Sequence, residues 1–283
     1  MKSEQLAWLI KRHGIEMTHI SHGSHIGSIL SVADIVAVLY NDVANITPEN
    51  VKDENRDRIV LSKGHAGAAI YAALAEKGFF PVEELKTHYA DGSRLSGHVS
   101  HKGIPGVEIS TGSLGHGACM ACGIALNAKL EKMPYYTYAI VGDGECDEGS
   151  IWEMALFANH FKLNQFVVIV DHNKMQSLDY CENTLALSPF AEKWKAFGWN
   201  VYDIDGHNHD ELRKAMNDAK KSQDKPTVII ANTVKGNGIS FMENDILWHY
   251  RFPHEGEEYD GALKELHAVM PEGVKDPYEE ESK

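Results

Sequence analysis

The sequence predicts an α/β fold: a doubly wound, mostly parallel sheet flanked by helices. Five short runs are rich in β-branched residues, and helix-sized segments separate the later ones. These runs are almost continuously apolar, which is typical of strands buried on both faces of a parallel sheet. No linker or internal repeat divides the chain. We therefore expect residues 1–283 to form one domain, with a mobile acidic tail at about 271–283.

The expected strands and helices follow one another along the chain. The strands are expected at residues 57–62, 136–142, 165–171, 200–205 and 227–234. Apolar side chains recur at helical spacing in 151–163, and Ser150 before them is a suitable N-cap. Residues 209–222 carry acids early and lysines late, as the helix dipole favours. We expect both segments to be crossover helices between strands.

The composition is that of an ordinary soluble protein. With 283 residues, 43% of them hydrophobic, the chain can bury a large core. The 27 lysines and arginines against 41 acidic residues give a net charge of −14, which repels nucleic acids and anionic lipid surfaces. We expect no segment as apolar as the roughly 18 to 20 residues that cross a bilayer, and the charged start does not resemble a signal peptide. A cytoplasmic location is therefore expected.

The four cysteines are too few for a disulfide scaffold, which favours a reducing compartment. Cys119 and Cys122 form the only close pair, within a segment of small residues at 116–128 that indicates a closely packed helix. We interpret both as small buried hydrophobic residues rather than as a redox or zinc pair.

Two polar turns follow neighbouring predicted strands. Gly142 and Gly144 let the backbone bend around Asp143, which offers a hard oxygen, and Asn173 offers a second one at the next strand end. Ligands of open α/β sheets bind at these carboxyl ends. Because Mg²⁺ keeps positions for substrate phosphates, these residues and a backbone carbonyl near Met175 predict a Mg²⁺-diphosphate anchor. The alternative is that the tripeptide is only a tight turn and Asn173 only a cap.

The spacing of these motifs indicates a family. Asp143 and Asn173 are 173 − 143 = 30 positions apart, with a strand end, a helix and a strand between them, which matches the thiamine diphosphate fingerprint Gly-Asp-Gly…Asn. The stretch from Gly142 to Gln176 resembles the transketolase version of this fingerprint. Five further blocks resemble the same family in its order: SHIGSILSVADIVAVLY, DRIVLSKGHAGAAIYAALAEKGFF, SRLSGHVS, STGSLGHG and KGNGISFMENDILWH. The chain is thus similar to the amino-terminal half of a transketolase over almost its whole length.

The resemblance implies a thiamine diphosphate-binding fold and a site for this cofactor with Mg²⁺. It implies that the metal ligands are Asp143, Asn173 and the backbone carbonyl of Met175. The residues that it places along the cofactor are Gly112, Leu114, Gly144, Glu145 and Asn173, with His65 and His249 near the diphosphate.

Histidines supply the implied proton chemistry. Four candidates each adjoin glycine or lie in a loop after a regular element, namely His25, His65, His98 and His249, and imidazoles exchange protons near pH 7. The resemblance places three of them, His25, His65 and His98, in the sugar channel. It also implies that Glu148 supports, across an interface, the glutamate that activates the cofactor. We interpret five other histidines as structural or surface residues: His13, His88, His160, His207 and His209.

The implied reaction is the transfer of a two-carbon ketol unit from a ketose, phosphorylated by default, to an aldose. Three positions depart from the family pattern: Val99 replaces the usual proline, His116 stands where glutamine is common, and Tyr250 replaces the glycine after Trp-His. These departures concern the substrate more than the class of reaction, and the sugar pair stays open.

A full-length transketolase also carries a pyrimidine-binding domain with the activating glutamate, which this chain lacks. The resemblance therefore implies an α₂β₂ heterotetramer with a separate carboxy-terminal transketolase subunit. One alternative is the α subunit of a 2-oxo-acid dehydrogenase, a family not known for the SKGH, TGSLGHG and WH blocks. Another is a non-catalytic scaffold, against which Asp143, Asn173 and Glu148 argue because all three are present.

Overall fold

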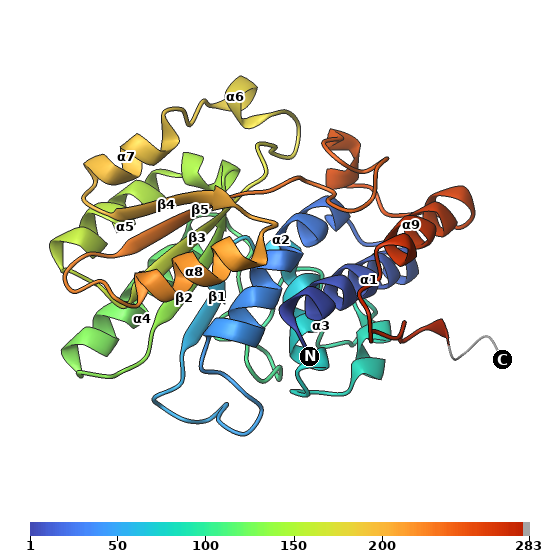
Figure 1. Ribbon diagram of the computed structural model, residues 1–283, viewed down its shortest axis with the longest axis horizontal. Coiled ribbons are helices and arrows are strands. Elements are labelled where there is room, and N and C mark those ends of the chain that lie inside the picture. The colour runs from blue at the N-terminus through green and yellow to red at the C-terminus, as the bar shows by residue number, and fades with distance from the viewer. Residues whose placement is uncertain (280–283) are drawn as a thin grey trace.

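The computed structural model describes residues 1–279, which form a parallel sheet with helices on both faces (Figure 1). The sheet of the described residues has the strand order β1-β2-β3-β5-β4, and every neighbouring pair is parallel. Its strands are β1 (Arg58–Leu61), β2 (Thr137–Gly142), β3 (Phe166–His172), β4 (Asn200–Asp205) and β5 (Thr227–Asn232). The predicted α/β class and all five predicted strands are confirmed.

Helices occupy most of the remaining chain. The α-helices are α1 (Ser3–Ser21), α2 (Ile26–Val38), α3 (Gly67–Glu76), α4 (His116–Leu130), α5 (Gly149–His160), α6 (Cys181–Thr184), α7 (Phe190–Ala196), α8 (His209–Ala219) and α9 (Glu257–Ala268). The shorter helical turns are η1 (Leu39–Val43), η2 (Gly64–Ala66), η3 (Val82–Thr87), η4 (Gly144–Asp147) and η5 (Ile246–His249).

The predicted helices around residues 116–128, 151–163 and 209–222 are confirmed as α4, α5 and α8. The predicted N-cap of α5 is wrong. The turn η4 ends at Asp147, and extended Glu148 caps α5 by accepting a hydrogen bond from Ile151 N at 3.1 Å, which leaves Ser150 inside the helix.

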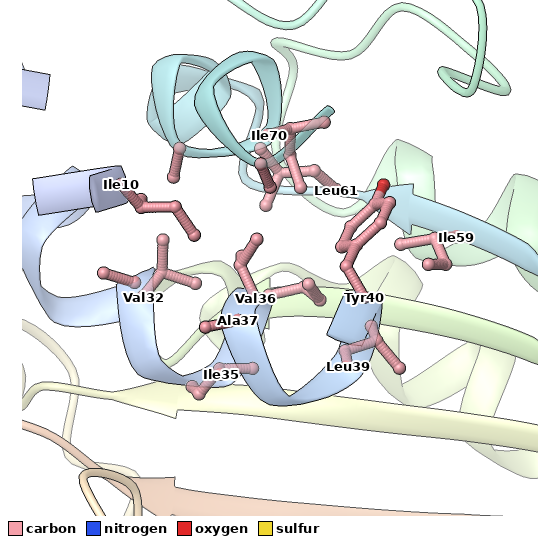
Figure 2. Packing of buried hydrophobic residues seen from close by; sticks show 14 of the residues in the cluster. Ile10, Val32, Ile35, Val36, Ala37, Leu39, Tyr40, Ile59, Leu61 and Ile70 are labelled. Carbon is pink, nitrogen blue, oxygen red and sulfur yellow. The ribbon is translucent and has the colours of Figure 1, made fainter. Parts of the chain in front are cut away.

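The sheet separates two hydrophobic cores, because successive side chains of a strand point to opposite faces. Tyr138 and Ile140 of β2 join the core built with α1, α2, α3 and α8, whereas Ala139 and Val141 join the one built with α4, α5 and α7. Figure 2 shows the first core, where Val36 of α2 is directed toward the side chains of α3 and β1. This packing fixes α2 beside the carboxyl ends of the strands.

The prediction that no segment is long and apolar enough to cross a membrane is wrong for the helix α2. With η1 it forms an 18-residue stretch, Ile26–Val43, of mean hydropathy 1.5. Within the fold, 89% of that stretch is buried, and every residue of α2 itself is buried. A helix packed on all sides is apolar all round, which explains the composition without a membrane.

Part of the acidic tail, expected to be mobile, packs against the protein instead. Asp276 is buried and accepts hydrogen bonds from Arg12 Nε and His267 Nε2, both at 2.7 Å. The Arg12 guanidinium also lies 4.3 Å from the centre of the Tyr278 ring. The acidic composition of the tail predicted a solvated segment. Instead, the buried guanidinium of Arg12 in α1 compensates the charge of the Asp276 carboxylate. Residues 280–283 of the predicted tail lie outside the described residues.

The carboxyl ends of four strands meet at one edge of the sheet. Beyond them the chain places Lys63 after β1, Asp143 after β2, Asn173 after β3 and Lys235 after β5. The chain leaving β3 continues to α7 on one face of the sheet, while the chain leaving β5 turns to α2 on the other, where Gly236 N donates to Gly27 O at 3.0 Å. A crevice of the kind that binds ligands in α/β sheets opens between these two exits.

Candidate active site

A cleft of about 240 Å³ opens at this edge of the sheet. It brings together every predicted site residue except Glu148, and these residues come from seven separate segments of the chain. The predicted residues that line it are His25, His65, His98, Gly112, Leu114, Asp143, Gly144, Glu145, Asn173, Met175 and His249. The five histidines interpreted as structural lie outside its lining.

Glu148 lies beside the cleft rather than in it. Its side chain is exposed at the start of α5, next to the loop that contains Leu114, and a Cβ added to Gly115 would lie 3.0 Å from Glu148 Cβ. The position leaves the carboxylate free to meet another polypeptide, so its role toward a partner stays a prediction.

Asp143 is a buried carboxylate held by backbone amides. Its Oδ1 accepts from Gly144 N at 2.8 Å and its Oδ2 from Lys174 N at 2.5 Å. Burial, and then the neighbouring charge of Asp171, raise the pKa of Asp143 to about 6. Within residues 1–279 no cationic side chain donates a hydrogen bond to this carboxylate, so a bound cation would stabilise its charged form.

The oxygens near Asp143 fit Mg²⁺ in particular. Among the described residues, no group of three or more histidine, cysteine, aspartate or glutamate side chains is arranged to hold a metal ion. An ion here would therefore depend on Asp143, the Asn173 amide oxygen, the Met175 carbonyl and oxygens of a bound diphosphate. A few protein oxygens completed by phosphate and water are the usual surroundings of protein-bound Mg²⁺.

Two buried lysines in the cleft are residues that the sequence reasoning missed. Lys63 and Lys235 are each 1% exposed and line the cleft. Both belong to motifs of the quoted blocks, Ser-Lys-Gly-His and Lys-Gly-Asn-Gly, and each directly precedes a glycine. Lys63 shares the Ser-Lys-Gly-His motif with His65, so its place in the sequence was a usable signal that it belongs to the site. Because buried lysines are rare unless they are paired, a partner for it was also to be expected.

Lys63 is paired with Asp171, a second residue that was missed. Asp171 lies at the end of β3 and accepts hydrogen bonds from Lys63 Nζ, Thr233 Oγ1 and, at 2.6 Å, Ser31 Oγ. Burial alone would raise the pKa of Asp171, but Lys63 and these hydroxyls outweigh burial and lower it. An ionised Asp171 therefore holds the Lys63 ammonium in place at the cleft.

Lys235 connects the metal-side loop to a histidine. Its Nζ donates to His249 Nδ1 at 2.8 Å, Gln176 O at 2.9 Å and Met175 O at 3.4 Å. Burial, and then the charge of Lys63, lower the pKa of Lys235 to about 8, so it stays largely protonated at pH 7. Because His249 Nδ1 accepts from this ammonium, the ring proton of neutral His249 is on Nε2, where it can be donated to a ligand.

The imidazole rings of three other histidines surround that of His25. Its ring centre lies 5.1 Å from that of His65, 5.6 Å from that of His98 and 5.0 Å from that of His249. Burial is the largest cause that lowers the pKa of each, to about 4 for His25 and about 3 for His249. Near pH 7 these rings are neutral, and each offers one donor and one acceptor.

The Nδ1 atom of His25 is buried and has no hydrogen-bond partner in the described structure. Its backbone is fixed, since its φ is 78° and its N–H donates to His249 O at 2.9 Å. A buried polar atom without a partner carries a free-energy cost that a bound ligand can relieve. This atom is therefore a candidate contact for a substrate hydroxyl.

The loops that carry His65 and His98 are packed backbone against backbone. Val99 N donates to Gly64 O at 2.9 Å, a bond that the proline usual in the family could not make. A Cβ at Gly67 would lie 2.6 Å from Val99 N, so only glycine allows this approach. The two histidines are thereby held at a fixed separation.

Glu145 ties three loops of the cleft together. It is buried and accepts hydrogen bonds from Ser62 Oγ, Gly115 N at 2.8 Å and Gly142 N at 3.0 Å. Burial raises the pKa of Glu145, although these bonds oppose the shift. The carboxylate holds the loops that border the predicted cofactor.

The cysteine interpretation agrees with the structure. All four cysteines are free thiols, and Cys122 is buried in α4 beside half-buried Cys119. Burial, followed by the neighbouring Cys119, raises the pKa of Cys122 to about 12, as expected for an unreactive packed thiol.

Comparisons with known proteins agree with the geometry of the cleft. Residues 3–250 match the family model "Transketolase, thiamine diphosphate binding domain". The 6-deoxy-6-sulfo-D-fructose transketolase subunit SqwG of Clostridium sp. (strain MSTE9) is 45% identical over 242 residues, which cover 86% of this chain and 88% of that protein. An apulose-4-phosphate transketolase subunit of Phocaeicola vulgatus is 37% identical over 252 residues, 89% of each chain.

A solved transketolase from Leishmania mexicana superposes with a TM-score of 0.87 at 29% identity. The match covers 94% of this chain but only 41% of that one, so the chain spans about two fifths of a single-chain transketolase. By contrast, it matches separate transketolase subunits along nearly their whole length.

Fold, cleft and family match together define a thiamine diphosphate-dependent α/β enzyme. Within that class the chain belongs to the transketolase family, and residues 3–250 are its thiamine diphosphate binding domain.

Proposed function

We propose that this chain is the amino-terminal, diphosphate-binding subunit of a two-subunit transketolase, which transfers a two-carbon ketol unit from a ketose to an aldose. The near-full-length match to proteins named as transketolase subunits carries this proposal. Those relatives are named for a sulfonated and a phosphorylated sugar, which supports a ketose with an anionic group as donor. Residues 1–283 act as one domain of this enzyme, and we expect it in the cytoplasm.

The inner part of the cleft suits a Mg²⁺-bound diphosphate. Asp143, the Asn173 amide and the Met175 carbonyl would hold the metal, and their burial and their convergence on the cleft support this assignment. The cations and N–H donors suited to diphosphate oxygens belong to Lys63, His65, Lys235 and His249, while Gly112, Leu114 and Gly144 border the cofactor through their backbone. When bound, thiamine diphosphate supplies the nucleophilic carbon and the electron sink of the transfer.

His25, His65 and His98 handle the hydroxyl protons of the sugars. Breaking the bond between C2 and C3 of a ketose removes the proton of its C3 hydroxyl, and joining the two-carbon unit to an aldose returns a proton to the new hydroxyl. A neutral imidazole can accept the first proton and, once protonated, donate the second. The proposal is supported by the closeness of the three rings and the unpartnered Nδ1 of His25.

A carboxy-terminal subunit would supply the pyrimidine-binding domain and complete an α₂β₂ heterotetramer. Large apolar side chains exposed on α4 and α5 support this proposal: Met120, Leu130, Leu156 and Phe157. Leu156 is 60% and Phe157 40% exposed, and apolar clusters of this kind mark protein interfaces.

The choice of substrate class tests this function. The chain is purified with its cognate partner, thiamine diphosphate and Mg²⁺, and supplied with ketose phosphates, sulfonated ketoses or 2-oxo acids. We expect ketol transfer from a ketose to an aldose and no decarboxylation of 2-oxo acids. Decarboxylation without ketol transfer would instead support the α subunit of a 2-oxo-acid dehydrogenase, and no reaction with any substrate would support a non-catalytic scaffold.

A further inference from the structure

Tyr250 lies at the exposed end of the cleft beside His249, and it is not itself among the residues proposed to hold the metal or the diphosphate. It lines the cleft, and its side chain is 60% exposed. Its ring centre lies 4.6 Å from that of His249 and 5.8 Å from that of His25. No hydrogen bond to its hydroxyl is found in the described part of the chain. An aromatic ring thus borders the opening while its phenol remains available to a ligand.

The ring is carried by an anchored turn. Asp245 Oδ1 accepts from Leu247 N at 3.0 Å at the start of η5, and Tyr250 N donates to Leu247 O at 3.4 Å at its end. His249 O accepts from His25 N at 2.9 Å, and buried Trp248 donates through Nε1 to Phe241 O at 2.9 Å. The backbone of Tyr250 is therefore fixed relative to His25, so the ring can act as a wall of the cleft.

The charged groups near Tyr250 indicate the kind of ligand atom that it meets. Of the cleft's buried cations, Lys63 is paired with Asp171, and Lys235 directs its ammonium to His249 Nδ1 and to the carbonyls of Gln176 and Met175. The guanidinium of neighbouring Arg251 is paired with Glu258. The imidazole rings that contact Tyr250 are neutral near pH 7, because burial lowers their pKa values. A hydroxyl group, which both donates and accepts, matches these neutral neighbours better than an anionic group does.

We propose that Tyr250 determines which sugars are accepted: its ring packs on the carbon chain beyond the transferred two-carbon unit, and its phenol hydrogen-bonds a hydroxyl of that chain. This inference rests on the proposed transketolase function and deepens it. A glycine at this position, as is usual in the family pattern, would remove both the wall and the phenol. Tyr250 is not among the proposed metal or diphosphate ligands but its ring contacts His249, so cofactor affinity is measured beside substrate selection to separate the two.

The test uses the variants Tyr250→Phe and Tyr250→Gly, each in complex with the partner subunit. For each, kcat/KM is measured with ketoses of four to seven carbons and with analogues deoxygenated beyond C3, and thiamine diphosphate binding is followed by fluorescence quenching. Leu247→Ala is the matched control, because Leu247 is exposed on the same turn but does not line the cleft.

Tyr250→Phe should lower kcat/KM about 3- to 10-fold for the ketose whose hydroxyl the phenol binds, which is the effect of one lost hydrogen bond. The kcat/KM of the analogue that lacks this hydroxyl should stay unchanged. Tyr250→Gly should change the ratio of kcat/KM between long and short ketoses by about tenfold or more, while cofactor affinity stays within twofold. Ratios that stay within twofold of the wild type in both variants would overturn the inference, as would equal losses for all sugars. Absence of ketol transfer in the wild-type complex would instead overturn the proposed function, and the inference with it.

Discussion

Individual residues divide the cleft into a charged inner end and a neutral outer end. At the inner end, Lys63 is neutralised by Asp171, whereas Asp143 accepts hydrogen bonds from the backbone amides of Gly144 and Lys174 and, within residues 1–279, from no cationic side chain. At the outer end, burial keeps His25 and its neighbours uncharged near pH 7. Groups of the same type placed in different surroundings acquire different properties, which would let one site combine the proposed anion binding with the proposed proton transfer.

The variant Asp143→Ala tests the charged end. It removes the one carboxylate among the proposed Mg²⁺ ligands, so we expect cofactor affinity in the assembled enzyme to fall more than tenfold, or by more than about 1.4 kcal/mol. Isothermal titration with thiamine diphosphate and Mg²⁺ measures the change, and Asp260→Ala on the exposed side of α9 serves as control. Unchanged Mg²⁺-dependent binding in Asp143→Ala would rule out the metal assignment.

The variants His25→Ala and His98→Ala test the neutral end. A positioned acid or base contributes about 10²–10⁴-fold to turnover, so kcat should fall within this range while cofactor binding is retained. His254→Ala, an exposed histidine outside the cleft, should behave as the wild type. If both cleft variants keep nearly full activity with every active ketose, the sugar channel is assigned to the wrong place.

At the scale of helices, strands and loops, local sequence explains the sheet better than the cleft. The strands β2, β3 and β5 were predictable because a strand buried on both faces needs an unbroken apolar run, whereas β4 lies at the edge of the sheet and is not buried on both faces as expected. The residues of the Gly-Asp-Gly and His-containing loops were predictable because their motifs are local. The pairing of Lys63 with Asp171 was not, because it joins positions 108 residues apart through the parallel sheet. The bond from Arg12 to Asp276 joins the two ends of the chain and was equally invisible to local patterns.

Gly67 tests whether the loops of the cleft depend on close backbone packing. In Gly67→Ala the new Cβ would lie 2.6 Å from Val99 N, and overpacking of this kind costs about 1–3 kcal/mol. The free energy of unfolding from urea titration should fall accordingly. Gly123→Ala is the matched control: its Cβ would meet nothing within 4 Å inside α4, so the variant should gain about 0.5–1 kcal/mol. Equal stabilities of the two variants would contradict this account.

The bond between Asp276 and Arg12 predicts a pH-dependent contribution to stability. Burial alone would raise the pKa of Asp276, but hydrogen bonds from Arg12 and His267 outweigh it and lower the pKa below that of the unfolded chain. A lowered folded-state pKa means that the stabilisation is present above about pH 4 and is lost as the pH falls through the folded-state value.

Asp276→Asn should therefore lower the free energy of unfolding at pH 7 by about 3 kcal/mol, the cost of removing one partner of a buried ion pair. The difference from the wild type should shrink as the pH is lowered below about 4. Glu192→Gln, which breaks the exposed pair with Lys195, should cost less than about 1 kcal/mol. A loss for Asp276→Asn that is the same at pH 3 and pH 7 would show that the carboxylate charge is not responsible.

At the scale of the whole molecule, the chain has the cleft proposed to hold the diphosphate and exposed apolar side chains on α4 and α5. These two helices begin where Gly115 and Glu148 lie close together. A partner that covers these side chains would remove them from water. The sequence showed apolar side chains recurring along 151–163, but only the fold shows that Leu156 and Phe157 are exposed.

Reconstitution from purified polypeptides tests the central claim most directly. Ketol transfer is measured with thiamine diphosphate and Mg²⁺ for this chain by itself, for the cognate carboxy-terminal subunit by itself and for their mixture, with mass spectrometry to verify that each preparation holds one polypeptide. We expect no transfer by either polypeptide without the other, and transfer together with tight cofactor binding on mixing. Robust transketolase activity of this chain by itself would contradict the account.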